Sequence, residues 1–332
     1  MTARDTDWDG VRLHVVTGKG GTGKTTVAAA LALALARRGR KVLLIEAEGR
    51  QGIARLFDRP PLPYEERKIA IGPGGDGEAA GGDVYALAID PEGALLDYLQ
   101  MFYGMRSAGR ALTKLGMVDF ATTIAPGLSD VLVTGKATEA ARRRKNGTYV
   151  YDAVVMDAPP TGRIGRFLNV SAEVSGLAKV GPIRSHADTV ANVIKSPQTA
   201  VHFVSLLEEM PVQETLDGIA QLRQITGVQV GGIVVNMARP AVLPRENLKA
   251  PPDLPALAAA LGRAGLHDTD ELAGALAGEL AEHAGNVELQ DRERNELEAA
   301  GQPVYELPLV VEGVDLAALY RLAGELREQG AA

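Results

Sequence analysis

The sequence predicts an α/β fold of the doubly wound type, with a mainly parallel sheet and an inserted helical lobe. Apolar, β-rich segments alternate with helical patterns along the 332-residue chain, which is typical of a parallel sheet covered by helices. Two of those segments, 42–45 and 153–156, are apolar at every position, as expected of central strands buried on both faces. A glycine-rich loop with a phosphate-binding pattern joins the first strand to the first helix, which predicts a P-loop domain.

The individual elements follow from hydrophobic periodicity, which is 2 for strands and 3.6 for helices. Strands are predicted at 11–17, 42–46, 84–89, 151–157, 200–206, 230–236 and 304–309. Helices are predicted near 25–38, 92–105, 128–143, 185–194, 213–224, 254–284, 288–300 and 315–328.

A chain of this length can bury one large core, and we expect residues 1–332 to form a single domain. Two strandless stretches, at about 90–145 and 165–198, are predicted helical insertions. Residues 72–83 are rich in glycine and predict a surface loop, and the prolines of 238–255 predict an irregular excursion.

Net charge and residue composition argue against some classes of binding partner and bound metal. The formal net charge of −7 argues against nucleic acid as the main partner, because sequence-independent binders carry a basic surface. The one dense basic run, 142–145, is predicted to be a solvated helix end, with a site for an anionic partner as the alternative. The chain has no cysteine, which excludes disulfides and thiolate metal sites and is typical of a cytoplasmic protein. The five histidines lack metal-ligand spacing and are predicted to be isolated structural or surface residues.

No segment predicts a secreted or membrane-spanning chain. The N-terminus is polar and acidic, without the features of a signal peptide. The apolar stretch Val27–Ala36 is about half as long as a membrane span and directly follows the glycine-rich loop, so it predicts a buried helix. The C-terminal stretch predicts a helix packed on the sheet, and we expect no direct membrane insertion. Its apolar face consists of Leu316, Leu319, Ala323 and Leu326.

Residues 18–25 read GKGGTGKT, the complete pattern G-x-x-x-x-G-K-[ST]. Backbone N–H groups and the helix dipole converge at such a turn, and glycine lets the backbone curl around a triphosphate. Lys24 can then reach the β- and γ-phosphates, and the Thr25 hydroxyl can bind Mg²⁺. The pattern does not require the second lysine, Lys19, which on local evidence is either a surface residue or a functional one. The predicted nucleotide contacts of the loop are Gly20, Gly21, Thr22, Gly23, Lys24, Thr25 and Thr26.

Polar residues also follow other predicted strands, at the sheet edge where ligands bind in open α/β folds. Asp157 comes directly after an apolar strand and can hold Mg²⁺ or its water shell. Glu46 and Glu48 are candidates to position an attacking water, or else solvated loop residues, and Arg50 can pair with either. Asn236 can bind an adenine edge or cap a turn.

Together these motifs resemble the deviant-Walker P-loop ATPases, and within them the ArsA/Get type of arsenical pump ATPases and tail-anchored-protein targeting ATPases. The stretch 19–26 resembles that family's phosphate loop. The stretch 157–168, with Pro160-Thr161-Gly162 and Arg166-Phe167-Leu168 inside it, resembles its switch II. Residues 234–236 are similar to its adenine motif, and 307–309 to the proline segment beside the base. The chain is most similar to an actinobacterial branch that includes paired, related subunits.

The resemblance implies a Mg²⁺-dependent, cytoplasmic ATPase that couples its nucleotide state to a conformational change acting on a protein partner or client. It implies a homodimer, or a heterodimer with a related ATPase subunit, and allows an apolar protein client. In that class the extra lysine, here Lys19, reaches across the dimer to the partner's nucleotide. It implies catalytic roles for Lys19, Lys24, Glu48 and Asp157, ATP contacts for Asn236 and Pro308, and Mg²⁺ ligation by Thr25 and Asp157.

The chain also departs from the family pattern. Glu48 stands where the family's switch I has the aspartate that orients the hydrolytic water, and Arg163 replaces the switch II histidine. The absence of cysteine excludes the thiol sites for zinc and arsenite. The stretch 169–198 lacks the methionines that line the family's client groove. Methionines lie instead at 101, 105 and 117, where they either fill the core of the helical lobe or form an apolar surface.

These departures leave two further functions open. One is a nucleotide-gated binding switch with negligible turnover, which the altered switch I favours. The other is a targeting factor for tail-anchored or other membrane proteins. A positioning ATPase is disfavoured because the acidic chain shows neither a basic DNA surface nor a membrane helix. A small-molecule kinase is disfavoured because it would give the second lysine of the loop, Lys19, no function.

Overall fold

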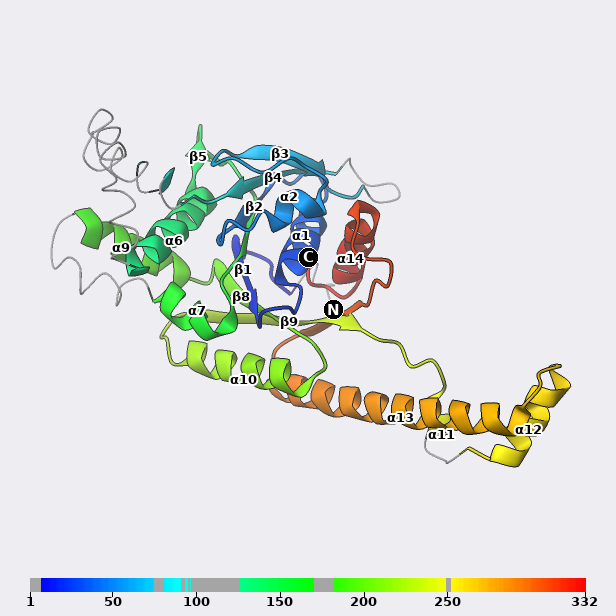
Figure 1. The fold of residues 1–332 in the computed structure, drawn as a ribbon. Helices are drawn as coiled ribbons and strands as arrows, with labels where there is room; N and C mark the ends of the chain where they lie inside the picture. The colour runs from blue at the N-terminus through cyan, green and yellow to red at the C-terminus, as the bar shows by residue number, and fades with distance from the viewer. Residues whose placement is uncertain are drawn as a thin grey trace, which may run out of the picture.

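The molecule is built on a central sheet with strand order β10-β9-β8-β1-β7-β2-β4-β3 (Figure 1). Every pair in it is parallel except β3–β4, which is antiparallel, so the predicted fold class is confirmed. The computed structural model describes residues 7–74, 81–90, 93–94, 96, 126–169, 182–248 and 252–332. The strands of this sheet are β1 (Leu13–Gly18), β2 (Val42–Glu46), β3 (Arg67–Ile71), β4 (Asp83–Ala88), β7 (Ala153–Asp157), β8 (Thr199–Ser205), β9 (Gln229–Ala238) and β10 (Val304–Pro308).

Side chains of the central strands alternate between two apolar cores, one on each face of the sheet. Leu43 and Ile45 of β2 enter one core, while Leu44 enters the other. The first core packs against α6, α7, α9 and α10, and the second against α1, α2 and α14. Helices on both faces leave the carboxyl ends of the strands as the edge at which loops can form a site. The helices are α1 (Lys24–Leu35), α2 (Gly52–Leu56), α6 (Pro126–Arg142), α7 (Thr161–Leu168), α9 (Pro182–Ile194), α10 (Glu209–Arg223), α11 (Arg245–Leu248), α12 (Leu254–Arg263), α13 (Thr269–Ala299) and α14 (Leu316–Glu328).

The sequence predicts every strand of the main sheet except β3. This edge strand buries only Ile69 fully, so it lacks the apolar run of a central strand. A small hairpin of β5 (Arg144–Lys145) and β6 (Thr148–Tyr149) was also missed. It turns at Asn146 and Gly147, both with positive φ, and the Asn-Gly pair is a hairpin signal that the sequence does carry.

The prediction of a solvated helix end for the basic run 142–145 is wrong in part. Helix α6 ends at Arg142, and the residues after it are not a uniformly solvated helix end. Arg143 is half-buried and donates to Glu66 at 2.6 Å and to Glu139 at 2.8 Å. These charge-assisted bonds raise the pKa of Arg143, so this residue joins α6 to the loop before β3.

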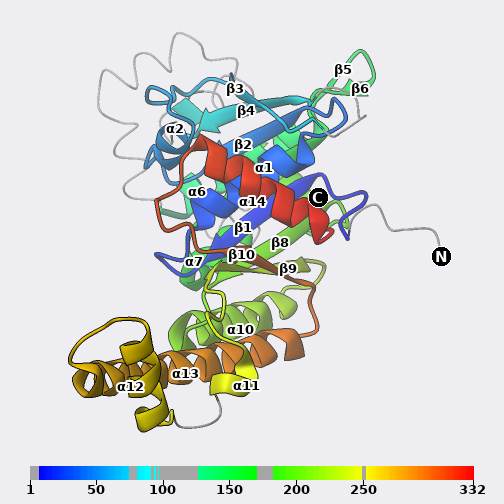
Figure 2. The ribbon, with the colours of Figure 1, turned by 90° about the vertical axis from the view of Figure 1, so that its right-hand side faces the viewer.

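Helices α12 and α13 form an arm that projects past the end of α10 (Figures 1 and 2). The sequence predicts helices at 254–284 and 288–300, but the break lies earlier. The chain turns between α12 and α13 through Gly265 and Asp268, both with positive φ, and α13 then runs unbroken for 31 residues. Most of the predicted lobe at 90–145 and part of the insertion at 165–198, including the methionines at 101, 105 and 117, lie outside the described residues.

The C-terminal helix α14 packs beside α1 and β10, as predicted. Leu319, Ala323 and Leu326 are fully buried, but Leu316 is 40% exposed and does not belong to the apolar face. Leu322 is buried in its place. In the part of the chain that the structure describes, no helix combines the length and apolarity needed to cross a membrane.

Two histidines predicted to be isolated form a buried pair between β1 and β8. The Gly232 N–H donates to His202 Nδ1 at 3.1 Å, which leaves the ring proton on Nε2, where it can be donated to His14 Nδ1 at 3.1 Å. The two rings stack, with centroids 5.3 Å apart, and Trp8 lies edge-on to His202. Burial lowers the pKa of His202 to about 4 and lowers the pKa of His14 well below its usual value.

This pair predicts an acid-sensitive fold. The unfolded chain takes up a proton at each histidine below about pH 6.5, but folded His202 does so only near pH 4. Stability is therefore fully present above pH 6.5 and is lost as the pH falls toward 4, by roughly 3 kcal/mol for this group. Urea unfolding from pH 7.5 to 4.5 is expected to show a shallower loss for His202→Phe than for the wild type. His267→Gln, at an exposed position, should keep the wild-type slope, and equal slopes for all three proteins would contradict the assignment.

Candidate active site

The glycine-rich loop lies between β1 and α1, as predicted, and its backbone leaves no room for side chains at two positions. A Cβ on Gly18 would lie 2.2 Å from the carbonyl oxygen of Val204. One on Gly23, which has φ +84°, would lie 2.3 Å from Asn236 Nδ2. Thr22 is buried and its hydroxyl donates to the Lys19 carbonyl at 2.9 Å. The loop is therefore held tightly against β8 and β9, with its N–H groups at the start of α1.

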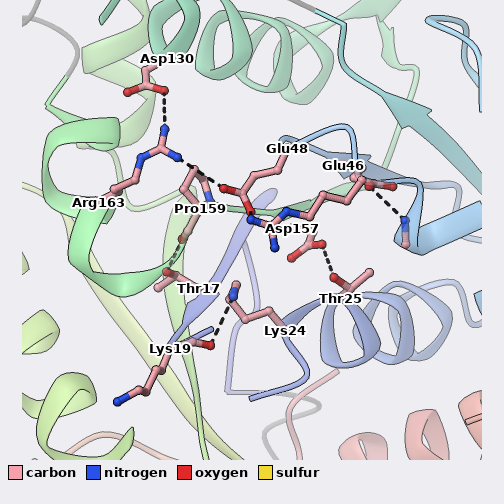
Figure 3. A network of polar contacts seen from close by, with 12 residues as sticks. Thr17, Lys19, Lys24, Thr25, Glu46, Glu48, Asp130, Asp157, Pro159 and Arg163 are labelled. Atoms are coloured by element: carbon pink, nitrogen blue, oxygen red, sulfur yellow. Dashed lines mark hydrogen bonds and ion pairs between the residues drawn. The ribbon is translucent and has the colours of Figure 1, made fainter. Parts of the chain in front are cut away.

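Lys24, Thr25 and Asp157 meet at the mouth of this loop (Figure 3). The Thr25 hydroxyl donates to Asp157 Oδ2 at 2.6 Å, and the Lys24 ammonium donates to the Lys19 carbonyl at 3.3 Å. Burial lowers the pKa of Lys24, while the charges of Asp157 and Glu48 oppose that shift. Burial raises the pKa of Asp157 to about 6, opposed by the Thr25 hydrogen bond and the Lys24 charge. The loop thus places a partly desolvated cation next to a buried carboxylate.

The Thr25 hydroxyl and the Asp157 carboxylate suit Mg²⁺ better than they suit a metal ion whose ligands all come from the protein. Mg²⁺ keeps several waters and is bound through one or two carboxylates plus substrate phosphates. Among the described residues no group of three or more His, Cys, Asp or Glu side chains could hold a metal ion. One carboxylate and one hydroxyl are the donor set expected when phosphate and water complete the coordination.

The two glutamates at the carboxyl end of β2 have different environments. Glu46 is buried and accepts from the N–H groups of Gly52 and Ile53 at 3.1 and 3.3 Å, so it anchors the start of α2. Glu48 lies at the sheet edge with its side chain 21% exposed and pairs with Arg50 at 3.4 Å. Of the two candidates for water positioning, only Glu48 has carboxylate oxygens free of backbone donors in the described residues.

Arg163 of α7 lies between Glu48 and Asp130 (Figure 3). Its guanidinium is 3.4 Å from Glu48 Oε1 and 3.5 Å from Asp130 Oδ1. This arginine therefore connects the loop after β2 with α6. The sequence places Arg163 in the switch II stretch, but no motif identifies its partner Asp130. The two residues meet only because α6 and α7 pack against each other.

Lys19 points away from Lys24, toward α10 (Figure 3). Its ammonium pairs with Glu214 at 2.9 Å, and the side chains are 28% and 38% exposed. Sequence analysis did not identify Glu214, which lies on a surface helix and belongs to no motif. An exposed pair of this kind contributes at most about 1 kcal/mol, so Lys19 can leave it at small cost.

Asn236 and Pro308 lie at the carboxyl ends of the neighbouring strands β9 and β10. Asn236 is buried, and its amide nitrogen donates to the Thr22 carbonyl at 2.9 Å. The structure thus brings this residue to the phosphate loop. Its contact with a base, like that of Pro308, stays a prediction.

Comparison with known proteins agrees with this geometry. Residues 11–196 match the family model described as anion-transporting ATPase (ArsA ATPase). The ATPase BagA of Mycobacterium tuberculosis is 52% identical over 326 residues, which cover 97% of this chain and 94% of that protein. The ATPase GET3 of Chaetomium globosum is 30% identical over 214 residues, which cover 63% of this chain and 58% of that protein. The chain belongs to the anion-transporting ATPase (ArsA) family of ATP-binding, ATP-hydrolysing enzymes.

Proposed function

We propose that the chain binds ATP with Mg²⁺ at this site and hydrolyses it as one half of a dimer, so that nucleotide state sets the dimer's conformation. The observation that carries the proposal is the Thr25–Asp157 bond of 2.6 Å beside Lys24. It gathers a hydroxyl, a carboxylate and a cation at the N-terminus of α1, where the phosphates of a bound nucleotide belong.

Each residue of the site then has a defined task. The loop N–H groups from Gly20 to Thr26 and the Lys24 ammonium hold the phosphates, and Glu48 orients the attacking water. Thr25 and Asp157 would hold Mg²⁺, which supplies positive charge to the β- and γ-phosphate oxygens when bound. Asn236 and Pro308 contact the base.

The proposed partner is a second ATPase subunit, either another copy of this chain or a related one, whose nucleotide receives Lys19. The support is the position of Lys19 on the loop, where its side chain points away from Lys24 (Figure 3). An apolar protein client is proposed as a further partner, with the nucleotide-dependent dimer as the element that engages it. Residues 1–332 are proposed to act as one domain, supported by the way β8, β9 and β10 from the C-terminal half continue the same sheet from β1.

A second candidate is a nucleotide-gated switch with negligible turnover. Arg50 and Arg163 both pair with Glu48, and a carboxylate held by two guanidinium groups is a weaker acceptor for a water proton. Both candidates predict ATP binding. They differ in whether Glu48 matters for phosphate release.

Glu48→Gln tests the two candidates. If Glu48 orients the attacking water, phosphate release under saturating ATP is expected to fall about 100-fold, with ATP affinity within a few-fold of the wild type. Glu328→Gln, on the exposed face of α14, is the matched control and should keep wild-type turnover. Equal, near-background rates for the wild type and Glu48→Gln would favour the switch instead.

A further inference from the structure

A groove of about 510 Å³ lies beside the phosphate loop and has helix α13 as its outer wall. Its inner wall comes from the carboxyl ends of β8, β9 and β10, represented by Leu207, Met237 and Leu309. The outer wall presents His283, Asn286 and Gln290. These three positions follow the i, i+3, i+7 spacing of one helical face.

The groove opens next to the loop that is proposed to hold the phosphates. Met237 directly follows Asn236, which donates to the Thr22 carbonyl at 2.9 Å. The Met237 methyl carbon would lie 3.4 Å from a Cβ on Gly23. Asn236 and Pro308, the proposed base contacts, directly precede the groove residues Met237 and Leu309. A base in contact with them would therefore lie at the edge of this groove.

The chemistry of the groove suits a flat, polar-edged ring. Leu207, Met237 and Leu309 offer apolar surfaces for the faces of such a ring, and pockets of this kind use few polar groups to fix orientation. The side-chain amides of Asn286 and Gln290 each present donors and an acceptor, which is the pattern needed to read a base edge.

The outer wall is tied to the body on two sides. The Val242 N–H donates to His283 Nε2 at 3.3 Å, which fixes the loop after β9 on α13. The C-terminal part of α13 packs against α10 and buries Leu297 completely. Figures 1 and 2 show α13 alongside α10 and then continuing outward into the arm. The wall is therefore a continuous helix held in place at the groove and extended beyond it.

We propose that Asn286 and Gln290 of α13 determine the base specificity of the ATPase, so that the arm helix forms part of the nucleotide site. The inference rests on the proposed function, because it assigns the groove to the base of the same nucleotide. Residues 11–196, which match the family model, do not include α13.

The test compares ATP with inorganic tripolyphosphate, which has phosphates but no base. Calorimetry with Mg²⁺ present measures both ligands on the wild type, on the double variant Asn286→Ala/Gln290→Ala, and on Asn295→Ala. Asn295 lies on α13 at an exposed position and does not line the groove. The double variant is expected to bind ATP about 10-fold more weakly, to bind tripolyphosphate as the wild type does, and to lose preference for ATP over GTP. The control should match the wild type throughout.

Hydrogen exchange on the wild type gives a second readout that needs no variant. ATP is expected to protect the amides of 283–290 from exchange, and tripolyphosphate is not. The proposal is overturned if the double variant changes affinity for both ligands equally or for neither, or if the two ligands protect 283–290 alike. Failure of the wild type to bind ATP would instead overturn the proposed function, so the two failures are distinguishable.

Discussion

Replacing Lys24 with alanine is expected to weaken ATP binding at least about 100-fold and to bring phosphate release to background. The ammonium is half-buried at the mouth of the loop, and burial already lowers its pKa, so the cation is only partly solvated before any ligand arrives. Removing one partner of a buried, hydrogen-bonded charge pair costs about 2–5 kcal/mol, and about 3 kcal/mol corresponds to a 100-fold change in affinity. Calorimetry with ATP and a phosphate-release assay measure the two effects.

Lys41→Ala is the matched control for this experiment. Lys41 immediately precedes β2 and lies at the opposite edge of the sheet from the phosphate loop, so its loss should leave ATP affinity unchanged. Thermal unfolding of both variants checks that the fold is intact, because Lys24→Ala also removes the hydrogen bond from the Lys24 ammonium to the Lys19 carbonyl. Wild-type ATP affinity in Lys24→Ala would mean that this loop does not hold the phosphates.

The sequence predicts those parts of the site that lie in short, contiguous motifs. The phosphate loop and Asp157 each follow an apolar strand, and parallel strands bring their carboxyl ends to one edge. The fold class follows for the same reason, because continuous apolar runs identify strands buried on both faces. Thr25 and Asp157 lie 132 positions apart in the chain, but Thr25 Oγ1 is 2.6 Å from Asp157 Oδ2. Each of the two residues belongs to a motif that can be recognised in the sequence.

Contacts made by surface helices could not be predicted in this way. Asp130 and Glu214 are single carboxylates on helices, and nothing in their neighbourhood distinguishes them from solvated residues. Their roles depend on how α6 and α10 pack on the sheet, which the hydrophobic period of a helix does not determine. The arm is a different case. Gly265, at positive φ just after α12, is a helix stop signal that the sequence does carry, and the predicted helix 254–284 wrongly runs through it.

The second large effect is expected at Lys19. If this lysine reaches the partner's nucleotide, Lys19→Ala should lower phosphate release about 1000-fold, the scale of an arginine finger supplied in trans, while each subunit keeps its ATP affinity within a few-fold. The resting pair with Glu214 is exposed and contributes at most about 1 kcal/mol, so it does not prevent the lysine from moving. Glu214→Gln is accordingly expected to preserve turnover, which separates loss of the lysine from loss of its resting partner.

A mixing experiment decides whether Lys19 acts within a subunit or between two copies of this chain. Lys19→Ala and Glu48→Gln are each expected to be nearly inactive alone. In a mixed dimer, the Lys19→Ala subunit keeps Glu48 and receives Lys19 from its partner, so one of its two sites is complete. Equal mixing should therefore restore roughly a quarter of wild-type phosphate release, because about half of the dimers are mixed and half of their sites work. If Lys19 acts in its own subunit, every site in every dimer lacks either the lysine or the glutamate, and mixing restores nothing.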